Sequence, residues 1–208
     1  AISTGDSAAL AGGLKAGVNM SRLRFGDNVP SDLENVWKVG VVGGLWYNFS
    51  LGKTFSIQPE ILYSQMGGSV KGPFPGYNRY IEVEQKIDYV SIPLLLKANL
   101  GRNFAIYAGP QFDARVSSKW RRSGLGEVDN KDSIHSTDFA VVGGIQLFPN
   151  SKFHLDLRYI HGLQDVWYKR DGGFYNQAFQ AAVGMRLFGK KITPKAVFVP
   201  PVIAPVDT

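Results

Sequence analysis

The stretch FHLDLRY, residues 153–159, decides the fold because large apolar side chains alternate with polar ones along its whole length. Successive side chains of a β-strand point to opposite faces, so this period of two predicts a strand with one apolar and one polar face. The same period recurs over residues 14–22, 38–49, 55–66, 86–97, 104–116, 139–147 and 179–187. Segment 86–97 is apolar on both faces, which leaves its orientation open. We therefore predict eight strands.

The connections between these segments alternate in length. Residues 50–54, 99–103 and 149–152 are tight turns, whereas residues 25–36, 67–85, 117–137 and 164–175 are long, polar and glycine-containing. Short turns at one end and long loops at the other are typical of an up-and-down barrel with both termini at the short-turn end. We predict an all-β protein, an eight-stranded antiparallel up-and-down transmembrane β-barrel over residues 13–188. An N-terminal periplasmic segment, 1–12, precedes it, and an extended, proline-rich periplasmic tail, 189–208, follows it.

The composition narrows the class of protein. The 208 residues include no cysteine, which removes disulfides and thiolate metal sites. No apolar run approaches the roughly 20 residues of a transmembrane helix, which excludes a helical membrane protein. The sequence begins AIST without an initiator methionine, so we expect a mature chain after removal of a signal peptide, although a trimmed expression product would begin in the same way.

A soluble eight-stranded barrel of the lipocalin kind would show the same alternation with its apolar face inward. Two features favour the membrane alternative. The polar face is rich in small residues and carries charges of both signs, which suits a crowded lumen in which they pair. These charged residues are Lys15, Glu60, Asp113, Arg115, Asp156, Arg158 and Arg186.

The second feature is the placing of aromatic residues near both ends of the apolar faces. Phe49, Phe55, Phe104 and Phe153 lie toward the short turns, and Tyr63, Phe112, Phe139 and Tyr159 lie toward the long loops. Two aromatic belts are expected at the two interfaces of a membrane. We therefore expect a barrel in the outer membrane of a Gram-negative bacterium, with its termini in the periplasm.

Three prolines, Pro59, Pro93 and Pro110, fall inside predicted strands. Each removes a backbone donor from the ladder of hydrogen bonds. We expect β-bulges to accommodate them, at positions that the sequence does not specify.

Several segments resemble the PorT-like outer-membrane β-barrel family of Bacteroidota, which are eight-stranded barrels of the OmpA/OmpX kind. They are GLKAGVN, QPEILYSQMG, YVSIPLLLK, YAGPQF, DFAVVGGIQL, DLRYIHGL and the closing GMRLF, and together they span about residues 13–188. Phe188 also resembles the terminal aromatic residue that barrel-insertion machinery recognises. The family is functionally diverse, so the resemblance implies a fold and a location rather than a task.

Catalysis has little support in the sequence. An outer-membrane lipase or acyltransferase needs a serine activated by a histidine, with a carboxylate to orient the histidine. The three histidines, His135, His154 and His161, do not form such a pattern, and the His-x-Ser strand pattern of lipid A deacylases is missing. They match no metal-ligand spacing either. We predict no enzyme activity, no catalytic residues, no bound metal and no cofactor.

One basic stretch contains an aromatic residue, Trp120. Its cations Arg115, Lys119, Arg121 and Arg122 are candidates for contact with the phosphates of lipopolysaccharide, since arginine suits phosphate geometry. The alternative is a solvated basic loop. Nucleic acid is not expected as a partner of a surface loop, and an open pore is not expected in a barrel just wide enough for its own side chains.

Residues 189–208 differ from the barrel in character. Prolines alternate there with the apolar residues Val197, Phe198, Val199, Val202 and Ile203, which predicts an extended path. Disordered tails are normally polar, so we interpret this apolar tail as a docking peptide for a periplasmic or membrane protein partner. The alternative is a mobile terminus with no partner.

These observations favour a non-enzymatic barrel that acts as an accessory or scaffold subunit of a larger envelope complex, docked through its tail. A stand-alone barrel whose outer loops bind a ligand or surface is the second hypothesis. A lipid-modifying enzyme is the third and weakest.

Overall fold

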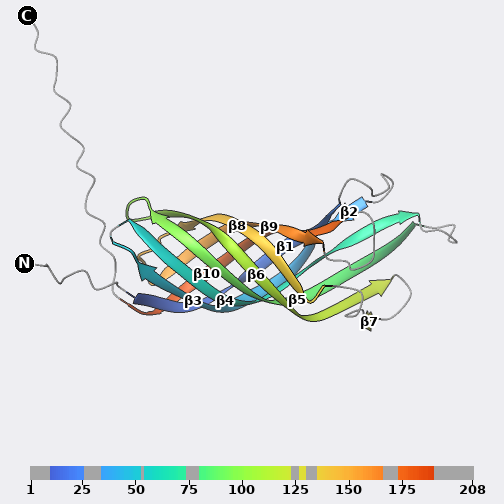
Figure 1. Ribbon diagram of the computed structural model, residues 1–208, viewed down its shortest axis with the longest axis horizontal. Coiled ribbons are helices and arrows are strands. Elements are labelled where there is room, and N and C mark those ends of the chain that lie inside the picture. Colours follow the sequence, from blue (N-terminus) through green and yellow to red (C-terminus); the bar gives the residue numbers. More distant parts are fainter. Residues whose placement is uncertain are drawn as a thin grey trace, which may run out of the picture.

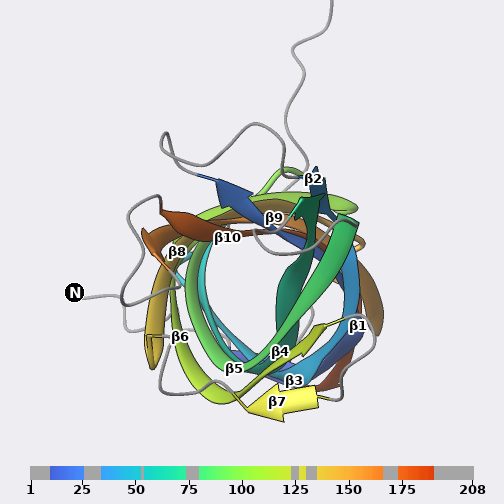
Figure 2. The same cartoon turned by 90° about the vertical axis from the view of Figure 1, so that its right-hand side faces the viewer.

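Long strands pair antiparallel into a closed ring (Figure 1 and Figure 2). The computed structural model describes residues 10–25, 34–52, 54–73, 80–122, 127–129, 135–165 and 173–189. The ring strands are β1 (Leu10–Phe25), β3 (Lys38–Ser50), β4 (Phe55–Pro73), β5 (Tyr80–Asn99), β6 (Phe104–Arg122), β8 (Thr137–Leu147), β9 (Phe153–Asp165) and β10 (Phe174–Phe188). Each pairs with its neighbours along the chain, and β10 pairs with β1, which closes the ring. The predicted all-β, eight-stranded up-and-down barrel is confirmed. Within the described residues, no helix is long and apolar enough to cross a membrane.

The ring has a short-turn end and a long-loop end. Strands β3 and β4, β5 and β6, and β8 and β9 connect through residues 51–54, 100–103 and 148–152. Backbone hydrogen bonds of 2.8 Å from Leu51 N to Phe55 O and from Leu100 N to Phe104 O close the first two turns. β1 begins and β10 ends at this same end, since Gly12 lies opposite Phe188.

Strands at the long-loop end run further than the sequence predicts. The loop predicted over residues 67–85 is largely a hairpin, because β4 continues to Pro73 and β5 begins at Tyr80. Val70 pairs with Val83 within it, and an ion pair of 3.5 Å joins Lys71 to Glu82. Two short strands lie inside the other predicted loops: β2 (Glu34–Val36) pairs with β4, and β7 (Glu127–Asp129) pairs with β6. Cross-strand pairing therefore continues beyond the apolar part of each strand.

The β4–β5 hairpin leans across the mouth of the ring at this end (Figure 2). Pairing between β3 and β4 stops at Val42 opposite Ser64. Beyond that point, Asn19 on β1 donates from Nδ2 to the carbonyl oxygen of Gln65 over 3.2 Å. Gly68 lies so close to β1 that a Cβ there would be 2.8 Å from the backbone nitrogen of Leu23. The long-loop mouth is thus partly covered by the protein's own hairpin.

Outward-facing side chains are apolar around the middle of the ring. Exposed examples from each strand are Val18, Val39, Ile61, Leu94, Ile106, Val141, Leu157 and Val183. The expected interface aromatics also face outward, with Phe49, Phe55, Tyr63, Phe139 and Phe153 exposed and Phe104, Phe112 and Tyr159 half-buried. The facing of β5, left open by the sequence, is now clear. Ile92, Leu94 and Leu96 face outward, whereas Ser91 and Lys97 face the lumen.

The three strand prolines do not cause bulges. Pro59 pairs with Leu94, Pro93 with Gln111 and Pro110 with Val141, and the register does not shift at any of them. Neighbouring pairs are missing beside Pro59 and Pro93, so the ladder loses bonds locally while keeping its alignment. The expectation of bulges at these prolines is wrong.

Candidate functional site

Two cations and two carboxylates meet inside the ring. Lys15 Nζ on β1 lies 2.6 Å from Glu60 Oε1 on β4 and 3.0 Å from Asp156 Oδ2 on β9. Arg158, two residues beyond Asp156, donates to both oxygens of Glu60 at 2.9 and 3.1 Å and to Asp156 Oδ1 at 2.9 Å. All four side chains are fully buried. Because their charges cancel and each carboxylate touches both cations, the cluster bridges opposite walls of the barrel.

Uncharged groups complete this lumen network. The Tyr107 hydroxyl donates to Asp156, as does Gln146 Nε2 over 3.0 Å, and Gln58 Nε2 donates to Glu60 over 2.7 Å. Lys97 donates to the side-chain oxygens Oε1 of Gln58 and Gln146 over 2.9 and 3.0 Å. A buried charge is costly unless both an opposite charge and hydrogen bonds satisfy it. The four charges of the cluster meet both conditions, whereas Lys97 has hydrogen bonds to side-chain amide oxygens and no carboxylate among the described residues in direct contact.

The structure brings together only some of the charges that the sequence assigns to one lumen network. Asp113 faces inward and is buried, but it accepts from Gln111 Nε2 over 3.0 and 2.9 Å. Arg115 is half-buried and lies further toward the long-loop end of β6. Arg186 lies at the short-turn end and donates to the carbonyl of Pro149 over 2.7 Å. The prediction that all seven charges form a single lumen network is therefore wrong. Only Lys15, Glu60, Asp156 and Arg158 form one cluster, because the other three lie at different depths along the barrel.

A buried apolar cluster lies on the long-loop side of the lumen, where the polar face led us to expect polar groups. It contains Leu23, Met66, Ile87, Tyr89 and Phe174. Asn176 Nδ2 crosses beside it to the Tyr89 hydroxyl over 3.0 Å and to Asp138 over 2.7 Å. Sequence analysis missed this layer because Met66 is the last residue of the strand predicted over 55–66, on its polar face, and Ile87 lies in segment 86–97, whose facing was left open.

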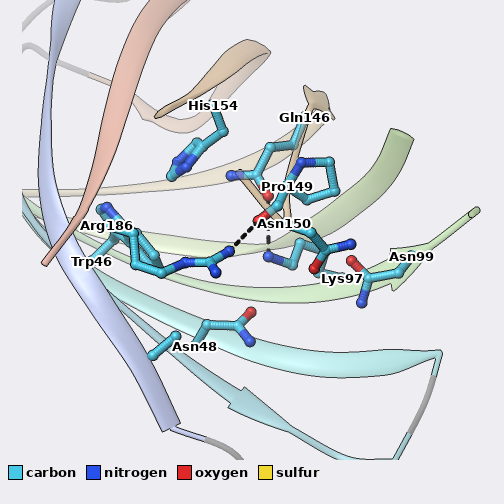
Figure 3. Close-up of a pocket in the computed structure, with 10 residues that line it drawn as sticks. Trp46, Asn48, Lys97, Asn99, Gln146, Pro149, Asn150, His154 and Arg186 are labelled. Atoms are coloured by element: carbon cyan, nitrogen blue, oxygen red, sulfur yellow. Dashed lines mark hydrogen bonds between the residues drawn. The ribbon is translucent and has the colours of Figure 1, made fainter. Parts of the chain in front are cut away.

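The short-turn mouth contains a small polar cavity of about 10 Å³ (Figure 3). His154 and Trp46 meet there edge to face, 5.0 Å between ring centres, and Arg186 and Lys97 also line the space. Neither ring nitrogen of His154 has a hydrogen-bond partner among the described residues. A volume of this size holds about one water molecule, which is too little for a substrate.

The three histidines lie apart from one another. His135 precedes β8 at the long-loop end, His154 is buried in the lumen near the short turns, and His161 lies on the outer face, where the Tyr159 hydroxyl is 3.2 Å from its Nδ1. Across the described ranges, no group of three or more His, Cys, Asp or Glu side chains is arranged to hold a metal ion.

Two of the four basic residues singled out in the sequence line a common pocket. Lys119 and Arg121 lie at the long-loop end of β6 and line a pocket of about 230 Å³ together with Trp120. Lys38, Glu84 and Lys86, from β3 and β5, line the same pocket, and Lys38 forms an ion pair with Glu84. Arg115 does not line it, and the side chain of Arg122 lies outside the described residues. No local sequence signal links Lys38 and Lys86 to this stretch.

The predicted docking residues Val197, Phe198, Val199, Val202 and Ile203 lie outside the described residues, as does segment 190–208 as a whole. The last described residues are those of β10 and Gly189.

Comparison with known proteins bears on the fold. A family described as the outer membrane protein beta-barrel domain matches residues 5–168. Neisserial surface protein A is 11% identical, over 84% of this chain and 96% of its own, at a TM-score of 0.52. Ail, the attachment invasion locus protein of Yersinia pestis, solved in complex with the heparin analogue sucrose octasulfate, is 14% identical, over 87% and 100%, at a TM-score of 0.48. At such identities the likeness shows the fold alone, and it rests on the neisserial protein. None of the curated proteins compared with the chain matches it.

Proposed function

The chain belongs to the family of outer-membrane protein β-barrel domains, and on this premise we propose that it is a non-enzymatic accessory or scaffold subunit of a larger envelope complex. The family places the protein in the outer membrane of a Gram-negative bacterium. The observation that carries the proposal is the occupied lumen. Lys15, Glu60, Asp156 and Arg158 join opposite walls at full burial, and apolar side chains fill the space beyond them. A barrel filled in this way suits an anchor better than a channel.

The placing of the histidines supports the absence of catalysis. A nucleophilic mechanism needs a base within hydrogen-bond reach of the nucleophile and a third group to orient it. His154 instead packs against Trp46 in a cavity of about 10 Å³, and His161 lies against Tyr159 on the outer wall. Among the described residues, neither of these two histidines has a serine as its hydrogen-bond partner.

We assign the docking role to the apolar, proline-rich segment 189–208. β10 is already paired with β1 as far as Phe188, so this segment is not needed to close the ring. An extended proline-rich chain has lost part of its conformational entropy before binding, which makes ordering on a partner less costly. Phe198 is the only aromatic residue in the segment and is our choice of anchor. In this proposal the short-turn end, where β1 begins and β10 ends, faces the periplasm.

We also propose a place among the PorT-like barrels of Bacteroidota. The support is the set of strand segments that resemble that family, among them YVSIPLLLK and YAGPQF, which carry Pro93 and Pro110.

The test is removal of residues 195–208 from the tagged protein, followed by detergent extraction from native membranes and quantitative mass spectrometry. We expect the truncated barrel to stay folded and to lose a stoichiometric partner, and Phe198→Ala to weaken that partner's retention. A tail of the same composition in permuted order is the matched control and should behave like the truncation. If the truncated and permuted proteins keep the same partners as the wild type, the docking role is refuted.

A second candidate function has one observation in its favour. The pocket lined by Lys38, Lys86, Lys119 and Arg121 gathers cations from three strands at the long-loop end. A stand-alone barrel that binds an anionic ligand or surface there would lose binding in a Lys86→Gln, Lys119→Gln double variant and would be indifferent to removal of the tail. Unchanged adhesion or ligand binding in that variant would exclude it.

A further inference from the structure

The outer wall of the barrel carries an apolar groove that neither the docking segment nor the lumen explains. It runs across β1, β10, β9 and β8, has a volume of about 440 Å³, and is lined by Val18, Met20, Gly143, Leu157, Phe179 and Ala181. Gly143 and Ala181 have little or no side chain, whereas the other outward-facing residues that line the groove are large. A Cβ built on Gly143 would meet nothing within 4 Å. The groove therefore exists because two small residues stand in a lipid-facing wall of bulky ones.

Polar groups lie just beyond the groove, toward its long-loop end. The Arg22 guanidinium stacks over the Trp37 ring at 4.5 Å, and its Nε donates to Gln177 Oε1 over 3.0 Å. Gln177 donates in turn to the Tyr159 hydroxyl over 2.8 Å, and this hydroxyl lies 3.2 Å from His161 Nδ1. On each strand, the polar residue is the next outward-facing one after a groove residue, toward the long loops. Arg22 comes next to Met20 on β1, Gln177 next to Phe179 on β10, and His161 next to Tyr159 on β9. The site thus has an apolar body and a polar end, as a lipid has.

The polar end is positively charged. In the part of the chain that the structure describes, Arg22 donates only from its Nε, so its two terminal nitrogens have no acceptor there. Arg24 follows on the same face of β1, with its guanidinium 4.8 Å from the centre of the Tyr175 ring. The Nε of Arg24 is buried and lacks a partner among the described residues. Stacked guanidinium groups with unused N–H donors suit the oxygens of a phosphate group.

We propose that this groove is a binding site for a phosphate-bearing lipid of the outer leaflet, the lipid A part of lipopolysaccharide. One acyl chain lies over Gly143 and Ala181, and a phosphate group contacts Arg22 and Arg24. A lipid fits better than a protein because the apolar part lies in the membrane-facing wall and the cations lie at its headgroup end. The groove itself does not depend on the proposed docking role, whereas the choice of the outer leaflet rests on the orientation proposed above.

The groove can be filled by one substitution. Gly143→Leu places a side chain in the open space without backbone strain, and Gly43→Leu is its matched control. Gly43 is an outward-facing glycine on β3, a strand that contributes no residue to the groove lining, and its Cβ would have a single neighbour at 3.5 Å. Arg22→Gln removes the charge at the other end of the site. All variants are first checked for slower gel migration on boiling, which shows that they fold as barrels.

Binding is measured by native mass spectrometry of the full chain in detergent, with purified diphosphoryl lipid A as the probe. We expect Gly143→Leu and Arg22→Gln each to weaken binding by about tenfold, which corresponds to about 1.4 kcal/mol. Gly43→Leu should bind as the wild type does. Lipid A stripped of its phosphates should lose the dependence on Arg22 but keep the dependence on Gly143.

Three results would overturn the proposal. Equal effects of Gly143→Leu and Gly43→Leu would show that no groove-specific chain binding occurs. Full competition by inorganic phosphate at millimolar concentration would show a simple anion site. Tighter binding of phosphatidylglycerol than of lipid A would exclude lipid A and, with it, the assigned leaflet, whereas the docking role would stand or fall with the separate tail experiment.

Discussion

Glu60→Gln is the sharpest test of the lumen network, because it changes charge with almost no change in shape. Glu60 accepts hydrogen bonds from Lys15, Gln58 and two nitrogens of Arg158, at 2.6 to 3.1 Å. In the variant, Asp156 becomes the one carboxylate facing both Lys15 and Arg158. The new amide nitrogen also turns N–H groups toward donors of Arg158. The cluster then holds one unbalanced positive charge in a site that excludes water.

The expected cost follows from burial. Removing one partner of a buried ion pair typically costs about 3–5 kcal/mol, because the remaining charge keeps its desolvation penalty. All four side chains here are fully buried, so we expect the free energy of unfolding to fall within that range. The double variant Lys15→Met, Glu60→Gln restores balance, with Arg158 still 2.9 Å from Asp156. It should therefore be less destabilised than Glu60→Gln alone, by about 1–2 kcal/mol, although it has lost more contacts.

The assay is urea unfolding of the barrel in lipid vesicles, followed by tryptophan fluorescence and repeated from the unfolded side to establish reversibility. Lys15→Met, Glu60→Gln and the double variant complete a thermodynamic cycle that isolates the pairwise interaction. Additive losses, or a double variant less stable than both single variants, would refute the argument that an unbalanced buried charge dominates the cost.

Three further outcomes are expected. Reconstituted in planar bilayers, the wild type should carry no steady ion current because the lumen is filled, and sustained conductance would contradict the filled lumen. The purified protein should migrate faster on gels before boiling than after, since a closed ladder resists detergent; a soluble, detergent-free monomer would contradict a membrane barrel. Gly184→Ala should cost about 1–3 kcal/mol, because its Cβ would lie 1.9 Å from His154 Nε2. Gly43→Ala is the control and should be near neutral, and equal effects of the two would show that the contact with His154 has no energetic consequence.

Alternation predicted the ring because it is a local property. One apolar and one polar face per strand are visible in stretches as short as FHLDLRY, and pairing of neighbours along the chain then requires no long-range information. The tight turns were equally local. Gly52 and Gly101 adopt φ values of 98° and 93°, in the left-handed region that glycine favours, where short joints were expected.

The membership of the lumen network was not local, because it depends on the stagger between strands. Lys15 lies opposite Gly44 on one side and Gly184 on the other, so no side chain beside it blocks the lumen. The long Lys15 side chain crosses that space to Glu60 and Asp156. Each of these carboxylates lies one inward-facing residue along its strand from the position that is level with Lys15. Asp113 has the same facing but lies opposite Asp138 on β8, too far along its strand to join. A list of inward charges cannot supply these offsets.

The ambiguity of segment 86–97 has a physical cause in a reversal of pattern along β5. In the half of β5 nearer the short turns, Ile92 and Leu94 face outward and Ser91 and Lys97 face inward, as suits a wall surrounded by lipid. Toward the long-loop end the outward positions are Glu82, Glu84 and Lys86, while Ile87 and Tyr89 are buried inside with Met66 of β4. That arrangement suits a wall surrounded by water, which needs polar groups outside and an apolar core within. One strand thus has apolar residues outside in its lipid-facing part and apolar residues inside in its water-facing part. Over the whole strand, both faces therefore contain apolar residues. The change occurs just beyond Tyr63 and Val90, which pair with each other, and it marks the level at which the wall leaves the lipid.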